Sequence, residues 1–156
     1  MTRDDLVAFA QTSIAKGSKS FAAASRLFDR QTRERVWLLY AWCRACDDLA
    51  DGQDHGGVMS AVADPAARMD YMRLTTAQAL AGKVVDDPPF DALRIVAAET
   101  GLTQAMADAV LDGFALDAQE WGPRSEDDLY KYCYHVAGAV GVMMASCASS
   151  AGASRV

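Results

Sequence analysis

The sequence predicts an all-α protein built as a single domain. Amphipathic stretches with helical periodicity fill most of the chain, and no run has the alternation of β-branched and polar residues that is typical of strands. Glycine and proline gather at a few places, where they separate the helical stretches. The 156 residues, 51% of them hydrophobic, are enough for one domain with its own hydrophobic core.

The first half of the chain is expected to form three helices. An amphipathic helix over about 4–15 is interrupted by the polar segment 16–20, Lys-Gly-Ser-Lys-Ser. A short helix is expected over 21–28 and a long one over 32–51. Gly52 and the two glycines that follow it then predict a loop.

Capping signals predict four further helices. Asp64 and Pro65 mark a start, because aspartate accepts from the free amides of a first turn and proline has no amide to satisfy. Gly101 marks an end, because glycine readily adopts the left-handed conformation that closes many helices. The expected spans are 65–82, 88–101, 103–121 and 130–145.

Net charge and the start of the sequence narrow the range of partners and locations. A net charge of −6 argues against nucleic acid as a partner, because phosphate backbones need clustered Lys and Arg. A divalent metal ion can still join carboxylates to a phosphorylated ligand. The start lacks a signal-peptide pattern, and the apolar stretch 136–145 is too short to span a bilayer. We expect a cytoplasmic protein, with peripheral membrane contact left open.

The four cysteines are expected to be reduced thiols, because no export signal precedes them. Cys43 and Cys46 have the spacing of half a zinc site, yet no second pair with ligand spacing exists. Buried thiols on helices are therefore the favoured interpretation.

The most informative segment is Tyr40-Ala-Trp-Cys-Arg44-Ala-Cys-Asp47-Asp48-Leu-Ala-Asp51. On a helix, Asp47 and Asp51 fall within about 40° of each other, with Tyr40 and Arg44 on the same stripe and Asp48 about 100° away. Two carboxylates one turn apart repel each other, unless a divalent cation bridges them. Arg44 beside them is suited to clamp a diphosphate oxygen.

These aspartates also have a simpler interpretation, as the solvated end of a helix before a glycine loop. Against it, the helix dipole disfavours acids at this end, and the apolar side chains of Val36 and Cys43 continue their stripe. We expect the pair to face inward or into a cavity. Spacing alone leaves ligand binding and a solvated helix end equally open.

Three segments together resemble the squalene/phytoene synthase family. The 40–51 segment resembles the first aspartate-rich signature of that family, and 16–21 resembles its serine segment. The segment 132–141 is similar to its central glycine-rich helix. The resemblance covers about 1–144, with bacterial phytoene synthases most similar in character.

The resemblance implies a role for each matching residue. Asp47 and Asp51 would hold Mg²⁺, or Mn²⁺ in its place, and would act in catalysis with Tyr40 and Arg44. The residues that would bind prenyl diphosphate substrates are Ser18, Ser20, Asp48, Tyr132, Val136, Ala137, Val140 and Gly141. Independently of the family, the spacing of Ala137, Gly141 and Ala145 gives a strip of small residues, which suits either close helix packing or a flat apolar ligand.

The implied function is head-to-head condensation of two geranylgeranyl diphosphates with loss of diphosphate, a step of carotenoid biosynthesis. One alternative is a squalene or dehydrosqualene synthase that uses farnesyl diphosphate. A second is a non-catalytic assembly or binding protein on the same fold. A third is a simple helical interaction module.

The match to the family stops before the end of the chain. Family members are about twice as long, and their second aspartate-rich motif has no counterpart after Met144. We expect a partial isoprenoid-synthase-type helical bundle over 1–144 that lacks its C-terminal helices. The residues 145–156 are expected to form a disordered, non-family tail that results from truncation or a frame shift. Such a chain would have little activity alone and could associate through exposed apolar faces.

Overall fold

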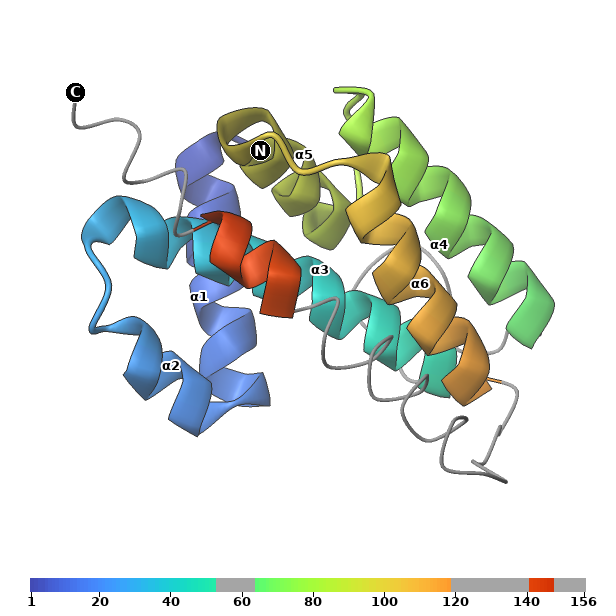
Figure 1. Cartoon of the computed structure of the whole chain (residues 1–156), viewed down its shortest axis with the longest axis horizontal. Helices are drawn as coiled ribbons and strands as arrows, with labels where there is room; N and C mark the ends of the chain where they lie inside the picture. The colour runs from blue at the N-terminus through green and yellow to red at the C-terminus, as the bar shows by residue number, and fades with distance from the viewer. Residues whose placement is uncertain (53–63, 119–140, 148–156) are drawn as a thin grey trace.

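A computed structural model describes residues 1–52, 64–118 and 141–147, and every regular element within them is a helix (Figure 1). The all-α prediction is confirmed. The helices are α1 (Arg3–Gly17), α2 (Lys19–Ser25), α3 (Arg30–Asp51), α4 (Pro65–Leu80), α5 (Pro88–Thr100) and α6 (Gln104–Ala118). The stretch 141–147 is also helical.

Helix α3 runs through the middle of the molecule and packs against α1, α4, α5 and α6 (Figure 1). Its second half is apolar on several sides, so Trp42, Cys46 and Leu49 are all fully buried. Burying a large apolar side chain stabilises the fold by about 1.5–3 kcal/mol relative to exposure. Trp42 donates a hydrogen bond from Nε1 to Oγ1 of Thr76 on α4 at 3.1 Å, so its polar group is satisfied inside the core.

A single residue, Ser18, separates α1 from α2. Its amide donates to the Ile14 carbonyl at 2.9 Å and closes α1, while its hydroxyl accepts from the Phe21 amide at 3.3 Å and opens α2. The break between the two helices is therefore one residue long and not the predicted five residues 16–20. One residue is enough because Ser18 bonds a free carbonyl at the end of α1 and a free amide at the start of α2. Helix α2 ends at Ser25, and 26–28, which were expected to be helical, form a turn.

The starts of α4 and α5 are held in different ways. Asp64 caps α4 as predicted, with Oδ1 accepting from the Ala67 amide at 3.0 Å. Asp87 occupies the corresponding position before α5 but makes no capping bond with its side chain. Its carboxylate instead accepts a hydrogen bond from the Tyr71 hydroxyl at 2.6 Å, which joins the start of α5 to α4. Gly101 closes α5 at a φ of 73°, as predicted.

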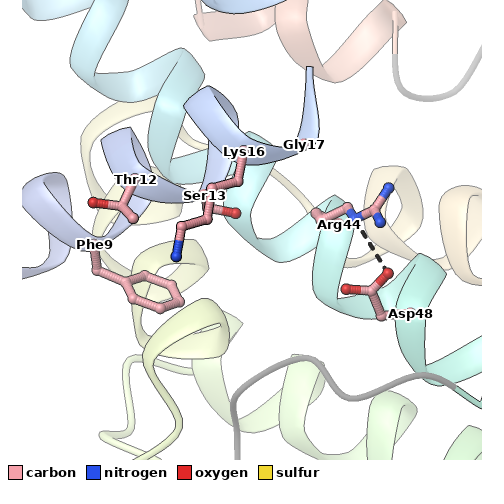
Figure 2. Close-up of a pocket in the computed structure, with 7 residues that line it drawn as sticks. All are labelled: Phe9, Thr12, Ser13, Lys16, Gly17, Arg44 and Asp48. Atoms are coloured by element: carbon pink, nitrogen blue, oxygen red, sulfur yellow. Dashed lines mark ion pairs between the residues drawn. The ribbon is translucent and has the colours of Figure 1, made fainter. Parts of the chain in front are cut away.

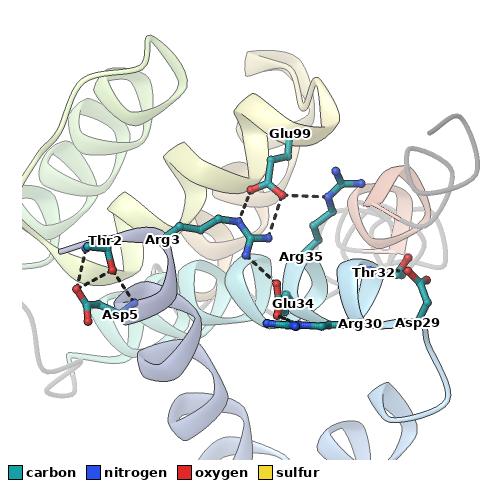
Figure 3. A network of polar contacts seen from close by, with 9 residues as sticks. All are labelled: Thr2, Arg3, Asp5, Asp29, Arg30, Thr32, Glu34, Arg35 and Glu99. Atoms are coloured by element: carbon teal, nitrogen blue, oxygen red, sulfur yellow. Dashed lines mark hydrogen bonds and ion pairs between the residues drawn. The ribbon is translucent and has the colours of Figure 1, made fainter. Parts of the chain in front are cut away.

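A network of charged side chains ties α1, α3 and α5 together (Figure 3). Arg3 donates to Glu99 at 2.8 Å through Nε and to Glu34 at 2.7 Å through Nη1. Arg35, which is buried, donates to Glu99 at 3.3 Å. Burial alone would raise the pKa of Glu99, but the hydrogen bonds and charges of Arg3 and Arg35 hold it below its ordinary value.

The last described stretch, 141–147, packs on the core through Met143 and Cys147, both fully buried. The expected boundary at Ala145 therefore falls inside a helix, because these two apolar side chains, four positions apart, extend its inner face. The tail beyond 147, the expected helix ends at 121 and 130, and the loop after Gly52 lie outside the described residues. None of the described helices is long and apolar enough to cross a membrane.

Cys43, Cys46 and Cys147 are free and buried, so the prediction of buried helix thiols is confirmed for them. Burial raises the pKa of Cys43 to about 12 and that of Cys147 to about 11, which keeps both thiols neutral. Cys133 lies outside the described residues.

Candidate functional site

A pocket of about 360 Å³ opens between the C-terminal turns of α1 and those of α3 (Figure 2). It is lined by Phe9, Thr12, Ser13, Lys16, Gly17, Arg44 and Asp48. The first five come from α1 and the last two from α3, so polar groups from two helices meet around one hollow. An arrangement of this kind suits a ligand with a charged end.

The wall that α3 contributes is an ion pair. Arg44 Nε lies 3.1 Å from Asp48 Oδ1, and Arg44 Nη1 lies 3.7 Å from Asp47 Oδ2. The side chain of Asp48 is 12% exposed, whereas those of Arg44 and Asp47 are both 41% exposed. Asp48 therefore anchors the guanidinium from the buried side and leaves part of its donor fork accessible.

Asp47 and Asp51 lie differently from what the periodicity predicted. Asp51 is exposed at the last position of α3, and Asp47 is partly exposed. The carboxylate that lines the pocket is Asp48, which was expected to lie off the stripe. The reason is that α1 packs on the side of α3 that carries Arg44 and Asp48. The apolar stripe from which the inward side was predicted marks only part of the surface of α3 that other helices cover.

The charge around this end of α3 fits a divalent cation. Three carboxylates, from Asp47, Asp48 and Asp51, and one guanidinium, from Arg44, carry a net charge of −3 + 1 = −2. A diphosphate alone would be repelled, whereas Mg²⁺ takes one or two carboxylates and fills its other positions with water and phosphate oxygens. Within the described residues, no group of three or more His, Cys, Asp or Glu could hold a metal ion. The three aspartates offer the oxygen donors that Mg²⁺ prefers, and their use as metal ligands stays a prediction.

Tyr40 meets the serine segment at Gly17. A methyl group on Gly17 would overlap with the hydroxyl of Tyr40, so only glycine leaves room for the phenol at this place. The ring of Tyr40 also lies 5.9 Å from that of Phe21. Burial raises the pKa of Tyr40, which keeps the phenol neutral. Two segments that the sequence marked separately are thus in contact.

The two serines of that segment are not in the wall of the pocket. Ser18 uses its hydroxyl to cap α2, and Ser20 is exposed on α2. Of the residues predicted to line a tunnel, Gly141 is exposed and has open space around it. Tyr132, Val136, Ala137 and Val140 lie outside the described residues.

Sequence reasoning missed the wall that α1 contributes. Thr12, Ser13 and Lys16 share one face of α1, next to the buried face formed by Ala10 and Ile14. Their spacing of one turn was a visible signal, because polar residues beside an apolar stripe lie at the edge of a helix interface. The sequence could not predict that this polar edge of α1 would line the same pocket as Arg44 on α3.

Comparison with known proteins assigns the chain to a family. The family model described as squalene/phytoene synthase matches residues 14–154. The chain belongs to the squalene/phytoene synthase family. It is 45% identical over 147 residues to the phytoene synthase of Pseudescherichia vulneris, covering 93% of this chain and 48% of that protein. It is 46% identical over 141 residues to a 15-cis-phytoene synthase from a Paracoccus species, covering 90% of this chain and 46% of that protein.

Solved structures of this family have the same fold. A dehydrosqualene synthase crystallised with a ligand superposes with a TM-score of 0.78 at 30% identity, covering 93% of this chain and 48% of that one. A squalene synthase from Alicyclobacillus acidocaldarius gives a TM-score of 0.78 at 22% identity, covering 93% and 52%. The chain thus spans about half the length of the relatives that it matches. Members of the family are prenyltransferase-type synthases, and Mg²⁺ is their typical metal.

Proposed function

We propose that this chain contributes one wall of a phytoene synthase-type active site, for head-to-head condensation of two geranylgeranyl diphosphates with loss of diphosphate. The observation that carries the proposal is the Arg44–Asp48 ion pair, which lines the pocket between α1 and α3 together with Lys16. Its relatives support it, because the phytoene synthases of Pseudescherichia vulneris and of the Paracoccus species cover 93% and 90% of this chain.

The charged groups would handle the diphosphate. Asp47 and Asp51 would hold Mg²⁺ from the accessible side of α3, and the bound metal would neutralise the diphosphate and make it a leaving group. Arg44, held in place by Asp48, would donate to a phosphate oxygen. Ser18 and Ser20 would donate hydroxyl hydrogen bonds at the mouth. The Ser18 hydroxyl oxygen accepts from the Phe21 amide, and its own hydrogen is still available to donate to the substrate.

The apolar and aromatic groups would protect the cation that ionisation leaves on the prenyl chain. Tyr40 is neutral and packed against Phe21, so its ring face could stabilise passing positive charge without donating a lone pair as an anion. The tunnel residues would exclude water, which otherwise quenches an allylic cation. They are Tyr132, Val136, Ala137, Val140 and Gly141.

A second candidate is condensation of farnesyl diphosphate, as in a dehydrosqualene synthase. The structural likeness to such an enzyme, at 30% identity and a TM-score of 0.78, favours it. The two candidates differ in tunnel depth, which depends on side chains between 132 and 141. Competition between prenyl diphosphates of the two lengths for binding separates them, because the deeper tunnel gains affinity with each added isoprene unit.

Binding of a non-ionising substrate analogue tests the proposal. Isothermal titration with a thiolo analogue of geranylgeranyl diphosphate should give tight binding only when Mg²⁺ is present. Asp47→Ala and Asp51→Ala should each weaken that binding by about tenfold or more, since each removes a charged metal ligand. Asp70→Ala is the matched control, because Asp70 is an exposed acid on α4 away from the pocket. Equal affinities for all three variants would contradict the site assignment.

A further inference from the structure

We propose that Arg68 on α4 is a positioning residue for the carboxylates at the end of α3. It holds the last turn of α3, and with it Asp51, in one position, and it contacts neither metal nor substrate itself. The inference rests on the proposed function, because Asp51 is one of the two residues that would hold Mg²⁺.

The guanidinium of Arg68 lies against the C-terminal turn of α3. Arg68 is only 8% exposed, and arginine is almost never buried unless it is paired. Its Nε donates to the Leu49 carbonyl at 2.6 Å. Its Nη2 lies 3.4 Å from the place that a Cβ atom on Gly52 would take. These contacts join α4 to the backbone at the end of α3.

The end of α3 gathers negative charge that its own sequence does not balance. The unpaired carbonyls at a helix C-terminus carry about half an elementary negative charge, and three aspartate carboxylates add to it here. The last turn of α3 contains no basic residue. Arg68 therefore supplies from the neighbouring helix the cation that the last turn of α3 lacks.

The carbonyl that Arg68 holds lies between the two residues proposed as metal ligands. Leu49 follows Asp47 by two positions and precedes Asp51 by two, so fixing its carbonyl fixes the backbone between them. Helix ends fray, and an unsupported last turn would spread Asp51 over several positions. Groups that orient metal ligands without touching the metal commonly change metal affinity by about 10–100-fold.

A general bond between α3 and α4 is the simpler interpretation of this contact, and two reporters separate it from positioning. The indole of Trp42 donates to Oγ1 of Thr76 at 3.1 Å and reports how α3 packs on α4 nearer the middle of α3. The amide of Gly52 donates to the carbonyls of Asp48 and Leu49 and reports the end of α3. A positioning residue should affect the second reporter and leave the first unchanged.

Nuclear magnetic resonance tests the positioning without any ligand. Arg68→Met keeps the aliphatic stem and removes the donors, so the Gly52 amide should exchange its hydrogen at least about tenfold faster. The Trp42 indole resonance should keep its chemical shift. Arg68→Lys should recover part of the protection, because it keeps a positive charge near the helix end. Arg73→Met is the matched control, since Arg73 lies on the same helix and pairs with Asp112 at 3.0 Å.

Three results of this comparison would overturn the proposal. They are unchanged exchange of the Gly52 amide in Arg68→Met, a displaced Trp42 resonance in the same variant, and no recovery in Arg68→Lys. Circular dichroism of each variant checks that its helices are retained.

Calorimetric titration with Mg²⁺ and the thiolo analogue tests the link to Asp51. Arg68→Met should weaken the Mg²⁺-dependent binding by about tenfold, and Arg73→Met should not change it. Added to Asp51→Ala, Arg68→Met should cause no further loss, because it acts through Asp51. Additive losses, or unchanged affinity in Arg68→Met, would contradict the inference. If the unchanged chain showed no Mg²⁺-dependent binding, the proposed function would fail, while the exchange of the Gly52 amide would still decide whether Arg68 holds the end of α3.

Discussion

At the scale of single residues, Gly17 controls the position of Tyr40. Gly17→Ala should lower the free energy of unfolding by about 1–3 kcal/mol, because the added methyl group would overlap with the Tyr40 hydroxyl. The gain in helix propensity from alanine, about 0.5–1 kcal/mol, is too small to offset this. Urea denaturation followed by circular dichroism measures the difference.

Two further variants separate the overlap with the Tyr40 hydroxyl from the effect of alanine on helix propensity. Gly141→Ala is the control, because Gly141 is helical and a methyl group there would meet nothing within 4 Å. It should leave stability unchanged or slightly raised. Gly17→Ala combined with Tyr40→Phe should recover part of the loss, because the overlapping oxygen is removed while the Cζ atom of the ring stays 3.2 Å from the added methyl carbon. If the double variant is as unstable as Gly17→Ala alone, the hydroxyl is not what the methyl group meets.

Asp47 and Asp48 are neighbours with different expected roles. Asp48→Asn should lower the free energy of unfolding by about 1–3 kcal/mol, because it weakens a charged contact that is mostly buried. It should also weaken binding of the thiolo analogue, because Arg44 loses its anchor. Asp47→Asn should change stability by less than about 0.5 kcal/mol, because Asp47 is partly exposed, yet it should weaken the Mg²⁺-dependent part of binding.

Urea titrations of both variants, with calorimetric titration of Mg²⁺ and analogue, distinguish these roles. If Asp47→Asn and Asp48→Asn lost the same stability, the two predictions would be wrong, because both rest on the difference in burial between the two side chains. The sequence singles out this cluster, because carboxylates at 47 and 51 repel each other on a helix, and its role in metal binding stays a prediction. It could not predict which carboxylate is buried, because that depends on which side of α3 receives α1.

At the scale of helices, the network around Glu99 should make the packing of α1 on α3 and α5 sensitive to acid. The folded-state pKa of Glu99 lies below its ordinary value of 4.5, so its contribution is fully present above that value. It is lost as the pH falls through the lowered folded pKa. Glu99→Gln should therefore lower the free energy of unfolding by about 1–2 kcal/mol near pH 7, and the gap to the unchanged chain should close in stronger acid.

Urea titrations at neutral pH and at about pH 3 measure this gap. Asp70→Asn is the control, because Asp70 is exposed on another helix and should show a small and constant difference. A gap for Glu99→Gln that is as wide in acid as at neutral pH would mean that lost packing, and not lost charge, destabilises the variant.

The end of a helix can be predicted where a single side chain or a single backbone conformation decides it. The side chain of Asp64 starts α4 and the left-handed conformation of Gly101 ends α5, both as predicted. The roles of Ser18 and Asp87 could not be predicted in this way, because each residue has more than one possible hydrogen-bond partner. Ser18 serves two helices and shortens the predicted break, while Asp87 accepts from Tyr71 on another helix. The bond of Asp87 to another helix is not encoded by local sequence, whereas both bonds of Ser18 are local, to residues four before and three after it.

At the scale of the whole molecule, the three carboxylates of the candidate site, from Asp47, Asp48 and Asp51, lie at one end of α3. The chain spans about half the length of its curated relatives, and in the proposed function the site that it presents would be one wall of a larger enclosure. Order and spacing of three motifs were enough to predict the family and the helical architecture. The contribution of Thr12, Ser13 and Lys16 was not predictable, because it arises from how α1 lies across α3.

Turnover by this chain alone should be low. Condensation needs two prenyl diphosphates held in near-attack geometry, and misplacement of reacting groups by about 1 Å can lower a rate about a hundredfold. In the proposed site, one carboxylate pair would leave the metal and the leaving diphosphate accessible to water on the side away from α3. With geranylgeranyl diphosphate and Mg²⁺, we expect at least about a hundredfold less phytoene, measured by mass spectrometry, than the Pseudescherichia vulneris enzyme gives.

Joining this chain to the remaining part of that relative provides the decisive comparison. The fused protein should form phytoene, because the 45% identity over the shared part preserves the helix faces that the two halves must match. Asp47→Ala in the fused protein should abolish the product, whereas Asp70→Ala should not. High turnover by the unfused chain would contradict the need for a second wall. A folded but inactive fusion would mean that the α3 wall of this chain does not replace that of its relative.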